Sequence, residues 1–456
     1  MKKIAKFLIV LGMMGQLSSC DYLDIVPDER AQESDTWKTE GAVRGYLYSC
    51  YGYLPANRTF GNSYWLAEEL TAVTKELFTT FKYGYYSPVS LGFTSNTWST
   101  IWNGIHQCYM FQESLKQVSN EYVTDEMKKQ YLAESNFLIA YYHFLSMRSY
   151  GPTMIIRSVI DLETPISGFP ERSSIDEVVA FINEKLDEAM SEGGLPTTWS
   201  GKDYGRATRL AALALKSRVY LYAASPLYNG NTEMYADFRS PLDGRQLIAQ
   251  EKSQAKWEIS ATQTKYAIDE VEKAKFHLYH DADAGEPSDA KPGLPNKAQR
   301  RLRYTNIDNQ TGNNPEIIWA DTRNDDYYGI QRRCPPRQTL GGKFAGISMT
   351  NCPTLQTIEA FYTKNGLPIN KDKTFDYDER YEYISAPENC DGNNYEDLVK
   401  YANFTPSSDK VMRLCTDREP RFYAWTTYHN GYFEFGKYNN EEISADPAKR
   451  AIRILC

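Results

Sequence analysis

Aromatic side chains set among polar and turn residues are the feature of this sequence best suited to holding a ligand. The chain has 35 Tyr, 8 Trp and 19 Phe, so 14% of its residues are aromatic. A tyrosine combines a flat apolar face with a polar tip and therefore suits half-hydrated surfaces and binding sites. Any single tyrosine can equally be a core residue. The rings of an aromatic cluster within a polar loop, however, cannot all point into the core.

Two such clusters supply the candidate binding residues. The first occupies residues 74–97, where tyrosines stand beside Gly84 and Pro88. The second begins in residues 316–320, a short strand candidate, and continues into a stretch where two adjacent tyrosines follow several charged residues. The candidates are Tyr83, Tyr85 and Tyr86 in the first cluster, and Trp319, Arg323, Asp325, Tyr327 and Tyr328 in the second. For Trp319, a place in a strand core explains the residue equally well.

The sequence lacks the motifs of the common catalytic and nucleotide-binding classes, namely G-x-S-x-G, H-E-x-x-H, Walker A and G-x-G-x-x-G. His277 and His280 could share a helix face, but no third ligand accompanies them. Residues 281–286 depart from the order of an EF-hand loop. We therefore expect no metal, no cofactor and no catalysis. A glycosidase-like pair among the 59 Asp and Glu residues remains an open alternative.

Helices are predicted to position these clusters. Apolar residues recur at helical spacing in several segments, and Ser174 with Glu177 forms a capping box. The expected helices are 40–53, 97–118, 126–150, 175–190, 206–224 and 257–276. Ala-x-x-x-Phe spacing and small residues within paired helices favour tetratricopeptide-like stacking. From residue 281 onward Gly, Pro, Asn and Asp predominate. There we expect an irregular second layer with a helix at 357–362 and strands at 316–320 and 421–427.

Charge and cysteine content narrow the class of protein. The 51 Lys and Arg against 59 Asp and Glu give a net charge of −8, which argues against a nucleic-acid partner. Of eight cysteines, Cys20 and Cys456 lie at or near the chain ends and six are internal. No C-x-x-C motif occurs, so we expect mostly free, buried thiols.

The first twenty residues are typical of an exported lipoprotein. Lys2, Lys3 and Lys6 precede a short apolar stretch that is too short to span a bilayer. Leu17-Ser-Ser-Cys20 resembles a bacterial lipobox, which predicts lipid attachment at Cys20. The expected organisation is a signal peptide over 1–19, a lipidated tether over 20–40 and one fold over 41–456.

Several motifs together resemble the SusD/RagB family of Bacteroidetes surface lipoproteins. They run from the lipobox to about residue 440, and their spacing is hard to obtain by chance. The segments are 21–27 (DYLDIVP), 133–144 (AESNFLIAYYHF) with 150–152 (YGP), 186–189 (LDEA), 206–222 (RATRLAALALKSRVYLY), 353–362 (PTLQTIEAFY) and 417–422 (DREPRF).

The resemblance implies a mostly α-helical fold, with a tetratricopeptide-like platform mainly in 97–280. An irregular ligand-binding half would comprise mainly 54–96 and 281–456. It also implies a non-catalytic lipoprotein on the outer membrane that captures glycans and delivers them to a TonB-dependent transporter barrel. A peptide-capturing relative or a protein-binding helical-repeat adaptor is the alternative. Family members continue with a further helix, so the ending at Cys456 predicts a missing C-terminal repeat.

Overall fold

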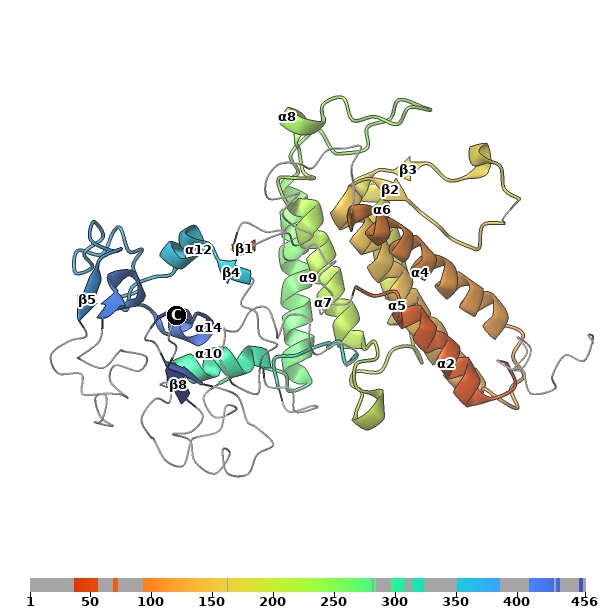
Figure 1. Ribbon diagram of the computed structural model, residues 1–456. Coiled ribbons are helices and arrows are strands. Elements are labelled where there is room, and N and C mark those ends of the chain that lie inside the picture. The colour runs from red at the N-terminus through yellow and green to blue at the C-terminus, as the bar shows by residue number, and fades with distance from the viewer. Residues whose placement is uncertain are drawn as a thin grey trace, which may run out of the picture.

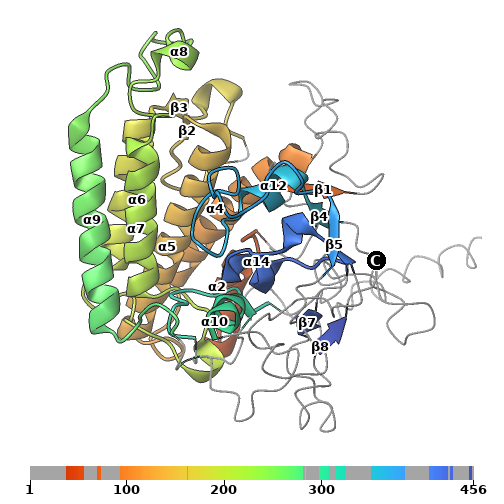
Figure 2. The ribbon, with the colours of Figure 1, turned by 90° about the vertical axis from the view of Figure 1, so that its left-hand side faces the viewer.

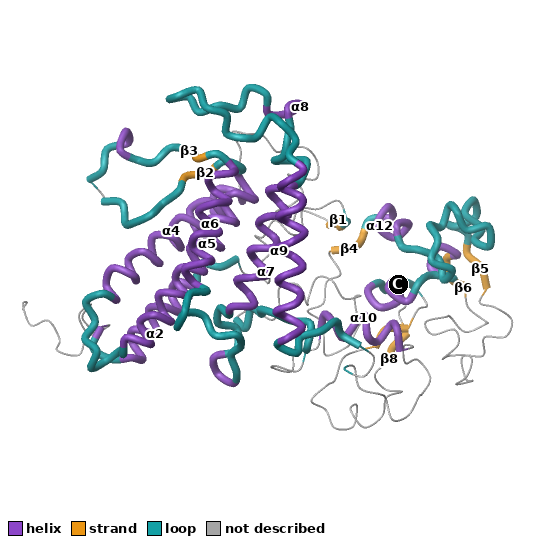
Figure 3. Tube along the Cα trace, turned by 180° about the vertical axis from the view of Figure 1, so that it is seen from behind, coloured by secondary structure: helices purple, strands orange, loops and turns teal. Residues whose placement is uncertain are grey.

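The protein divides into a stack of long helices and a half built mainly of loops (Figures 1 and 3). We call these the helical platform and the loop-rich half. The computed structural model describes residues 37–55, 69–72, 93–161, 163–280, 283, 297–307, 314–323, 351–385, 410–429, 432–434 and 451–453. This architecture confirms the predicted fold class.

Six long helices make the platform, and each packs against its neighbours in chain order. They are α2 (Glu40–Tyr51), α4 (Phe93–Leu115), α5 (Asp125–Tyr150), α6 (Ile175–Ala189), α7 (Arg209–Ala224) and α9 (Gln254–Lys273). Figure 2 shows α9, α7, α6 and α5 side by side. All six coincide with predicted helices. However, α4 begins four residues early, so residues 93–96 are helical rather than part of the expected loop.

The helix starts follow from side-chain caps. Ser174 and Glu177 form the predicted capping box at the start of α6. Thr124 accepts a hydrogen bond from the Met127 amide at the start of α5. Thr208 accepts one from Ala211, so α7 begins at Arg209 rather than at the predicted residue 206. The first backbone amides of a helix have no partner within the helix, and each cap satisfies one of them. The caps therefore fix where each helix begins.

The core of the platform centres on α5, which contacts α2, α4, α6 and α7. Phe137, Tyr142 and Phe144 are fully buried there. Burying one such ring contributes roughly 2–3 kcal/mol. Tyr142 donates from its hydroxyl to the Cys50 carbonyl over 2.6 Å. Its ring lies against Gly104 of α4, where a Cβ would come within 2.7 Å of the ring, so only glycine allows this approach.

Among the described residues, the loop-rich half holds only short elements. Its helices are α10 (Lys297–Ile307), α12 (Leu355–Ala360) and α14 (Pro420–Trp425). Its strands pair antiparallel as β1 (Leu70–Ala72) with β4 (Asn351–Pro353), β5 (Tyr383–Ser385) with β6 (Lys410–Met412), and β7 (Tyr432–Glu434) with β8 (Ala451–Arg453). A small separate core gathers Ile369, Phe375 and Leu414.

Two loops project from one end of the platform. One carries strands β2 (Thr153–Met154) and β3 (Arg172–Ser173), which pair with each other, and the 3-10 helix η3 (Ile166–Gly168). The other carries the short helix α8 (Thr232–Tyr235). Two further 3-10 turns are η4 (Gly201–Asp203) and η5 (Arg413–Cys415).

Both predicted strands in the second half are wrong, whereas the predicted helix near 357–362 is confirmed as α12. Residues 316–320 form turns, because Asn314 accepts from the amides of Glu316 and Ile317 and none of the described strands lies alongside. Residues 420–425 form α14, in which Pro420 occupies the first helical turn. Phe422, Tyr423 and Ala424 are buried consecutively, which alternating strand geometry would not allow.

The four cysteines within the described ranges are free thiols, as predicted. Cys50 and Cys108 are buried, whereas Cys352 and Cys415 are only half-buried. Cys20 lies outside the described residues, so its lipid attachment stays a prediction. Within those ranges, no helix is both long and apolar enough for a bilayer crossing.

Candidate functional site

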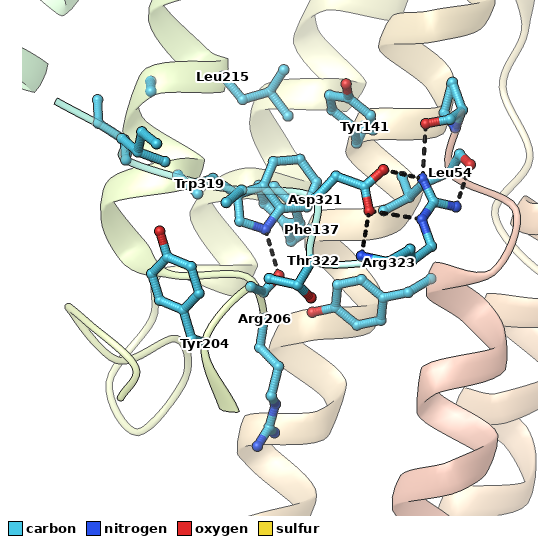
Figure 4. Close-up of a pocket in the computed structure, with 18 of the residues that line it drawn as sticks. Leu54, Phe137, Tyr141, Tyr204, Arg206, Leu215, Trp319, Asp321, Thr322 and Arg323 are labelled. Carbon is cyan, nitrogen blue, oxygen red and sulfur yellow. Dashed lines mark hydrogen bonds and ion pairs between the residues drawn. The ribbon is translucent and has the colours of Figure 1, made fainter. Parts of the chain in front are cut away.

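A cavity of about 760 Å³ opens where the helical platform meets residues 314–323 (Figure 4). Its walls come from the end of α2, from α5 and α7, and from the turn before α7. Its lining combines aromatic rings with charged side chains. The aromatic members are Tyr48, Tyr51, Phe137, Tyr141, Tyr204 and Trp319. The charged members are Lys202, Arg206, Arg218, Glu316, Asp321 and Arg323.

Trp319 forms part of the cavity wall and is half-buried. Its indole N–H donates to the Gly205 carbonyl over 2.8 Å. Its ring meets Phe137 and Tyr141 edge-on, with centroids 5.1 and 5.4 Å apart. In place of the expected strand, α5 and the turn before α7 hold the ring. Trp319, predicted from the sequence as a binding residue, thus lines the cavity, and its role toward a ligand stays a prediction.

Arg323 closes the cavity at the end of α2. Its guanidinium donates to the carbonyls of Leu54 and Pro55 over 2.8 and 2.9 Å, and it pairs with Asp321 at 2.6 Å (Figure 4). The hydrogen bonds to Asp321 raise the pKa of Arg323 above its usual value. Because these contacts occupy its donors, Arg323 is better placed to hold the wall together than to bind a ligand directly.

A buried ion pair fixes the floor of the site. Glu134 is fully buried and pairs with Arg206, while the Tyr51 hydroxyl donates to the other Glu134 oxygen over 2.6 Å. Arg206 also pairs with Asp203 at 2.8 Å and stacks on the Trp199 ring, 4.0 Å from its centroid.

The charge states of this network follow from its contacts. Burial raises the pKa of Glu134, and the Arg206 charge opposes that rise. Burial also works against charge on Arg206, but the bonds to Glu134 outweigh it and raise the pKa. Arg206 therefore stays charged, and its guanidinium points away from Trp319 (Figure 4).

Sequence analysis missed this network as a functional feature. Glu134 and Arg206 both belong to motifs quoted above, but 72 positions separate them. A carboxylate shortly before the apolar run of α5 was the available signal, since an unpaired charge is rarely buried. Nothing in the spacing identified its partner.

Among the aromatic residues of the lining, Tyr48 is the most exposed at 41%, and a second accessible ring is that of Tyr204. Tyr204 is half-buried and stands at the cavity edge opposite Trp319 (Figure 4). Burial raises the pKa of its hydroxyl, so the phenol remains protonated at neutral pH. No hydrogen bond from that hydroxyl is made within the described part of the chain. The cavity thus presents flat apolar rings with polar groups at their margins.

The remaining candidates lie outside the described residues. Tyr83, Tyr85 and Tyr86 fall in 73–92, and Asp325, Tyr327 and Tyr328 fall in 324–350. The chain leaves the cavity at Pro55 and Arg323, and residues 56–68 and 324–350 follow directly. The six tyrosine and aspartate candidates therefore stay predictions.

The described residues contain no group of three or more metal-ligating side chains. His277 and His280 stack face to face, with ring centroids 5.2 Å apart. His277 Nδ1 lies 3.8 Å from an Asp283 oxygen, which is too far for a hydrogen bond. The geometry suits ring stacking rather than a metal site.

Comparison with protein families gives two matches. Residues 21–221 match a SusD-like family whose description reads "Starch-binding associating with outer membrane". Residues 315–451 match the profile of the SusD family, SusD_RagB. No curated protein matches the chain.

Solved structures provide the second comparison. A protein named BT4246 aligns with a TM-score of 0.69 and 29% identity, covering 87% of this chain and 66% of that one. A SusD-like protein (BF3747) from Bacteroides fragilis aligns with a TM-score of 0.61 and 19% identity, covering 93% and 65%, and supports the fold alone. The chain spans about two thirds of the length of these relatives.

Proposed function

Because family profiles match both its first and its second half, this chain belongs to the SusD/RagB family, and we propose that it captures glycans in the cavity beside Trp319. The observation that carries this proposal is the lining of the cavity. A sugar ring has an apolar C–H face and a polar rim, which flat aromatic rings and hydrogen-bonding groups complement. The cavity offers Tyr204 and Trp319 for the face, with Lys202 and Thr322 at the rim.

A cavity of this volume suits a short stretch of sugar units, because ligand pockets of roughly 300–1,000 Å³ enclose drug-sized molecules. The wall is also prearranged. Arg323, Trp319 and Arg206 are each fixed by hydrogen bonds. A prearranged wall loses little side-chain entropy when a ligand binds, which favours capture.

The family is associated with the outer membrane. We infer that lipid on Cys20 tethers this protein there, that the tether faces the cell exterior, and that a TonB-dependent transporter barrel receives the captured glycan. The lipobox-like Leu17-Ser-Ser-Cys20 supports the tether. A Cys20→Ser variant should move from the membrane fraction to the soluble fraction, and retention in the membrane would contradict this part of the proposal.

Binding without turnover is the expected activity. The test is a screen of the full chain against plant, host and microbial polysaccharides, followed by calorimetry with the corresponding oligosaccharides. Tyr204→Ala should weaken binding about 10-fold, the loss expected for one stacked ring. Its melting temperature should hardly change, because the ring is only half-buried.

Tyr266→Ala is the control, because Tyr266 is an accessible tyrosine on α9 that does not line the cavity. It should bind like the unmodified chain. If Tyr204→Ala bound the glycan as tightly as the unmodified chain does, the cavity would be excluded as the binding site. Release of shorter sugars would identify a hydrolase, and binding of peptides alone would favour the peptide-capturing alternative.

The loop tyrosines require their own variant. Simultaneous replacement of Tyr83, Tyr85 and Tyr86 by Ala should weaken glycan binding with little loss of stability. If all three contribute to the site, the loss should exceed that of Tyr204→Ala. Unchanged affinity would remove this cluster from the proposal and leave the cavity as its basis.

A further inference from the structure

A second group of aromatic side chains lies far from the cavity, on the outer edge of the loop-rich half. The Arg380 guanidinium lies 4.0 Å from the centroid of the Tyr377 ring and 4.4 Å from that of Tyr381. Tyr383 begins β5, two residues beyond Tyr381. Figure 1 places β5 on the side of this half that faces away from the helical platform. We call Tyr377, Arg380, Tyr381 and Tyr383 the tyrosine surface.

Hydrogen bonds hold this surface in one arrangement. Glu359 accepts from Arg380 Nε over 2.7 Å and from the Tyr381 hydroxyl over 2.5 Å. Arg380 Nη1 donates to the Tyr377 carbonyl over 2.9 Å. The Arg380 carbonyl accepts from the Leu414 amide over 2.7 Å. This bond ties the segment to η5, the turn that directly follows β6.

The small core of the loop-rich half supports the surface from below. Tyr377 packs against the core cluster of Ile369, Phe375 and Leu414. Ile384 of β5 is half-buried, while Tyr383 and Ser385 on either side are exposed. This alternation turns Tyr383 outward. The surface is therefore a rigid feature of the fold and needs no rearrangement to meet a ligand.

The rings remain accessible despite this support. Tyr381 is 43% exposed and Tyr383 is 53% exposed. Within the described ranges, neither ring contacts another aromatic ring. Two large, accessible tyrosines two residues apart on a fixed backbone offer apolar faces that a ligand can cover, because exposed aromatic area gains free energy when it leaves water.

The charges around the rings are paired in part and negative on balance, because Asp376, Asp378 and Glu382 lie exposed on the same segment. Glu359 neutralises Arg380, and Glu379 pairs with Arg413 at 3.1 Å. The chain as a whole carries a net charge of −8. This combination does not attract polyanions such as nucleic acids. It suits an uncharged ligand with apolar faces and hydroxyl groups.

We propose that the tyrosine surface is a second glycan-binding site that stacks the sugar rings of a neutral polysaccharide outside the cavity. The inference rests on the proposed glycan-capture function. The rings of Tyr381 and Tyr383 would cover sugar C–H faces, Glu359 would accept from sugar hydroxyl groups, and Ser385 would accept from or donate to them. A long polysaccharide can occupy the cavity and this surface together, which raises its apparent affinity. A short oligosaccharide occupies the cavity alone.

The test compares a polymer with a six-sugar fragment of the same polymer. The full chain is run in gels containing amylopectin, laminarin, galactomannan or arabinoxylan, and retardation gives the affinity for each polymer. Calorimetry gives the affinity for the matching hexasaccharide. Tyr381→Ala/Tyr383→Ala should lose at least about 10-fold in polymer affinity, because the second contact is removed. Its hexasaccharide affinity should stay unchanged.

Two comparisons make the result decisive. Tyr266→Ala, which removes a tyrosine that is 44% exposed on α9, should behave like the unmodified chain. Tyr204→Ala should weaken both polymer and hexasaccharide, since it alters the cavity. Thermal melts of Tyr381→Ala/Tyr383→Ala and Tyr266→Ala should lie close to that of the unmodified chain, because the three rings are exposed and the hydrogen bond from Tyr381 to Glu359 lies near the surface.

Equal retardation of Tyr381→Ala/Tyr383→Ala and the unmodified chain would overturn this inference and leave the proposed function intact. Equal weakening of polymer and hexasaccharide would also overturn it, because the tyrosine surface would then be the single site. If none of the four polymers retards the unmodified chain, both this inference and capture of these neutral glycans fail.

Discussion

Each half of the molecule is organised around a buried arginine, and the two arginines are satisfied in different ways. In the helical platform, Arg206 pairs with the buried carboxylate of Glu134. In the loop-rich half, Arg418 is 2% exposed and has no carboxylate partner within the described residues. Its guanidinium donates instead to backbone carbonyls, those of Ile358, Phe361, Tyr362 and Leu414.

The difference follows from the backbone. Helices satisfy their own carbonyl groups, so a buried arginine among them needs a side-chain acceptor. Turns and short helices leave carbonyl groups without partners, and a guanidinium with five donors can gather several of them. Burial lowers the pKa of Arg418, but the value starts so high that the group stays charged. Arg418 is thus a structural centre for a region that lacks regular elements.

Replacing Arg418 should have the largest effect. Arg418→Met removes the donors from several buried carbonyls, and each unsatisfied group costs about 1–3 kcal/mol. We expect the free energy of unfolding to fall by about 4 kcal/mol in urea titrations. Arg421→Met is the matched control, because Arg421 lies three residues further along the chain, on α14, but pairs with Glu419 near the surface. The control should cost less than about 1 kcal/mol.

A similar loss in both arginine variants would contradict the central role of Arg418. No second substitution should rescue Arg418→Met, because the stranded acceptors belong to the backbone. This expectation separates the loop-rich half from the platform, where the acceptor is a side chain.

In the platform, breaking the ion pair should cost slightly less and should be repairable. Glu134→Leu leaves the Arg206 charge with only Asp203 as a partner, and loss of one member of a buried pair costs about 3 kcal/mol. Adding Arg206→Met removes the stranded charge and should restore part of the stability. Urea titrations of the two single variants and the double variant measure this coupling. Strictly additive losses would show that the pair acts as two independent groups.

The two halves should also respond to different ranges of pH. His143 in α5 is fully buried, its Nδ1 lies 2.8 Å from the Ile139 carbonyl, and its Nε2 accepts from the Ile156 amide. Burial lowers the pKa of His143 to about 4. The unfolded chain therefore binds this proton more readily, and stability falls as the pH drops from about 6.5 toward 4.

At pH 5 the expected loss from His143 is about 2 kcal/mol relative to pH 7. Asp372 in the loop-rich half behaves differently, because hydrogen bonds from Thr363 and Thr374 hold its pKa below the usual range. The stability that Asp372 contributes persists above about pH 4 and is lost only at lower pH. Urea titrations from pH 7 to 4 should show the loss of stability that His143 causes. In His143→Gln, the slope of the free energy of unfolding against pH should be flatter. An unchanged slope in His143→Gln would assign it to other groups.

The two halves also differ in how well the sequence predicted them. Long helices have a strong periodic signal, and caps such as Ser174 with Glu177 are local, so the platform was predicted almost completely. In the loop-rich half, residues 421–427 were predicted as a strand because their apolar residues are too few to show a period. The helix there depends on Pro420 and on the carbonyl network around Arg418, which no local pattern reveals.

The candidate site shows the same limit. Trp319 was found because an aromatic residue beside polar ones is visible in the sequence. Glu134, Arg206 and Tyr204 were not assigned to the site, because their meeting depends on how α5 and the turn before α7 pack. Tertiary contacts across 72 positions leave no local trace in a single sequence.

The junction between the halves provides the smallest predicted effect and the most direct test of how they are joined. Gly205 has φ of 97°, and its carbonyl accepts from the Trp319 indole. A Cβ at Gly205 would lie 2.8 Å from the Thr322 methyl group. Gly205→Ala should therefore combine backbone strain with crowding and cost about 2 kcal/mol.

Gly201 separates these two causes, because its φ is 59° but a Cβ added there would have no neighbouring atom within 4 Å. Gly201→Ala should cost about 1 kcal/mol from strain alone. The excess in Gly205→Ala measures contact across the junction, and adding Thr322→Ala should remove that excess. Equal losses in both glycine variants, measured by urea titration, would mean that residues 314–323 do not press on the turn before α7. The cavity wall would then be held by Arg323 and the Trp319 hydrogen bond alone.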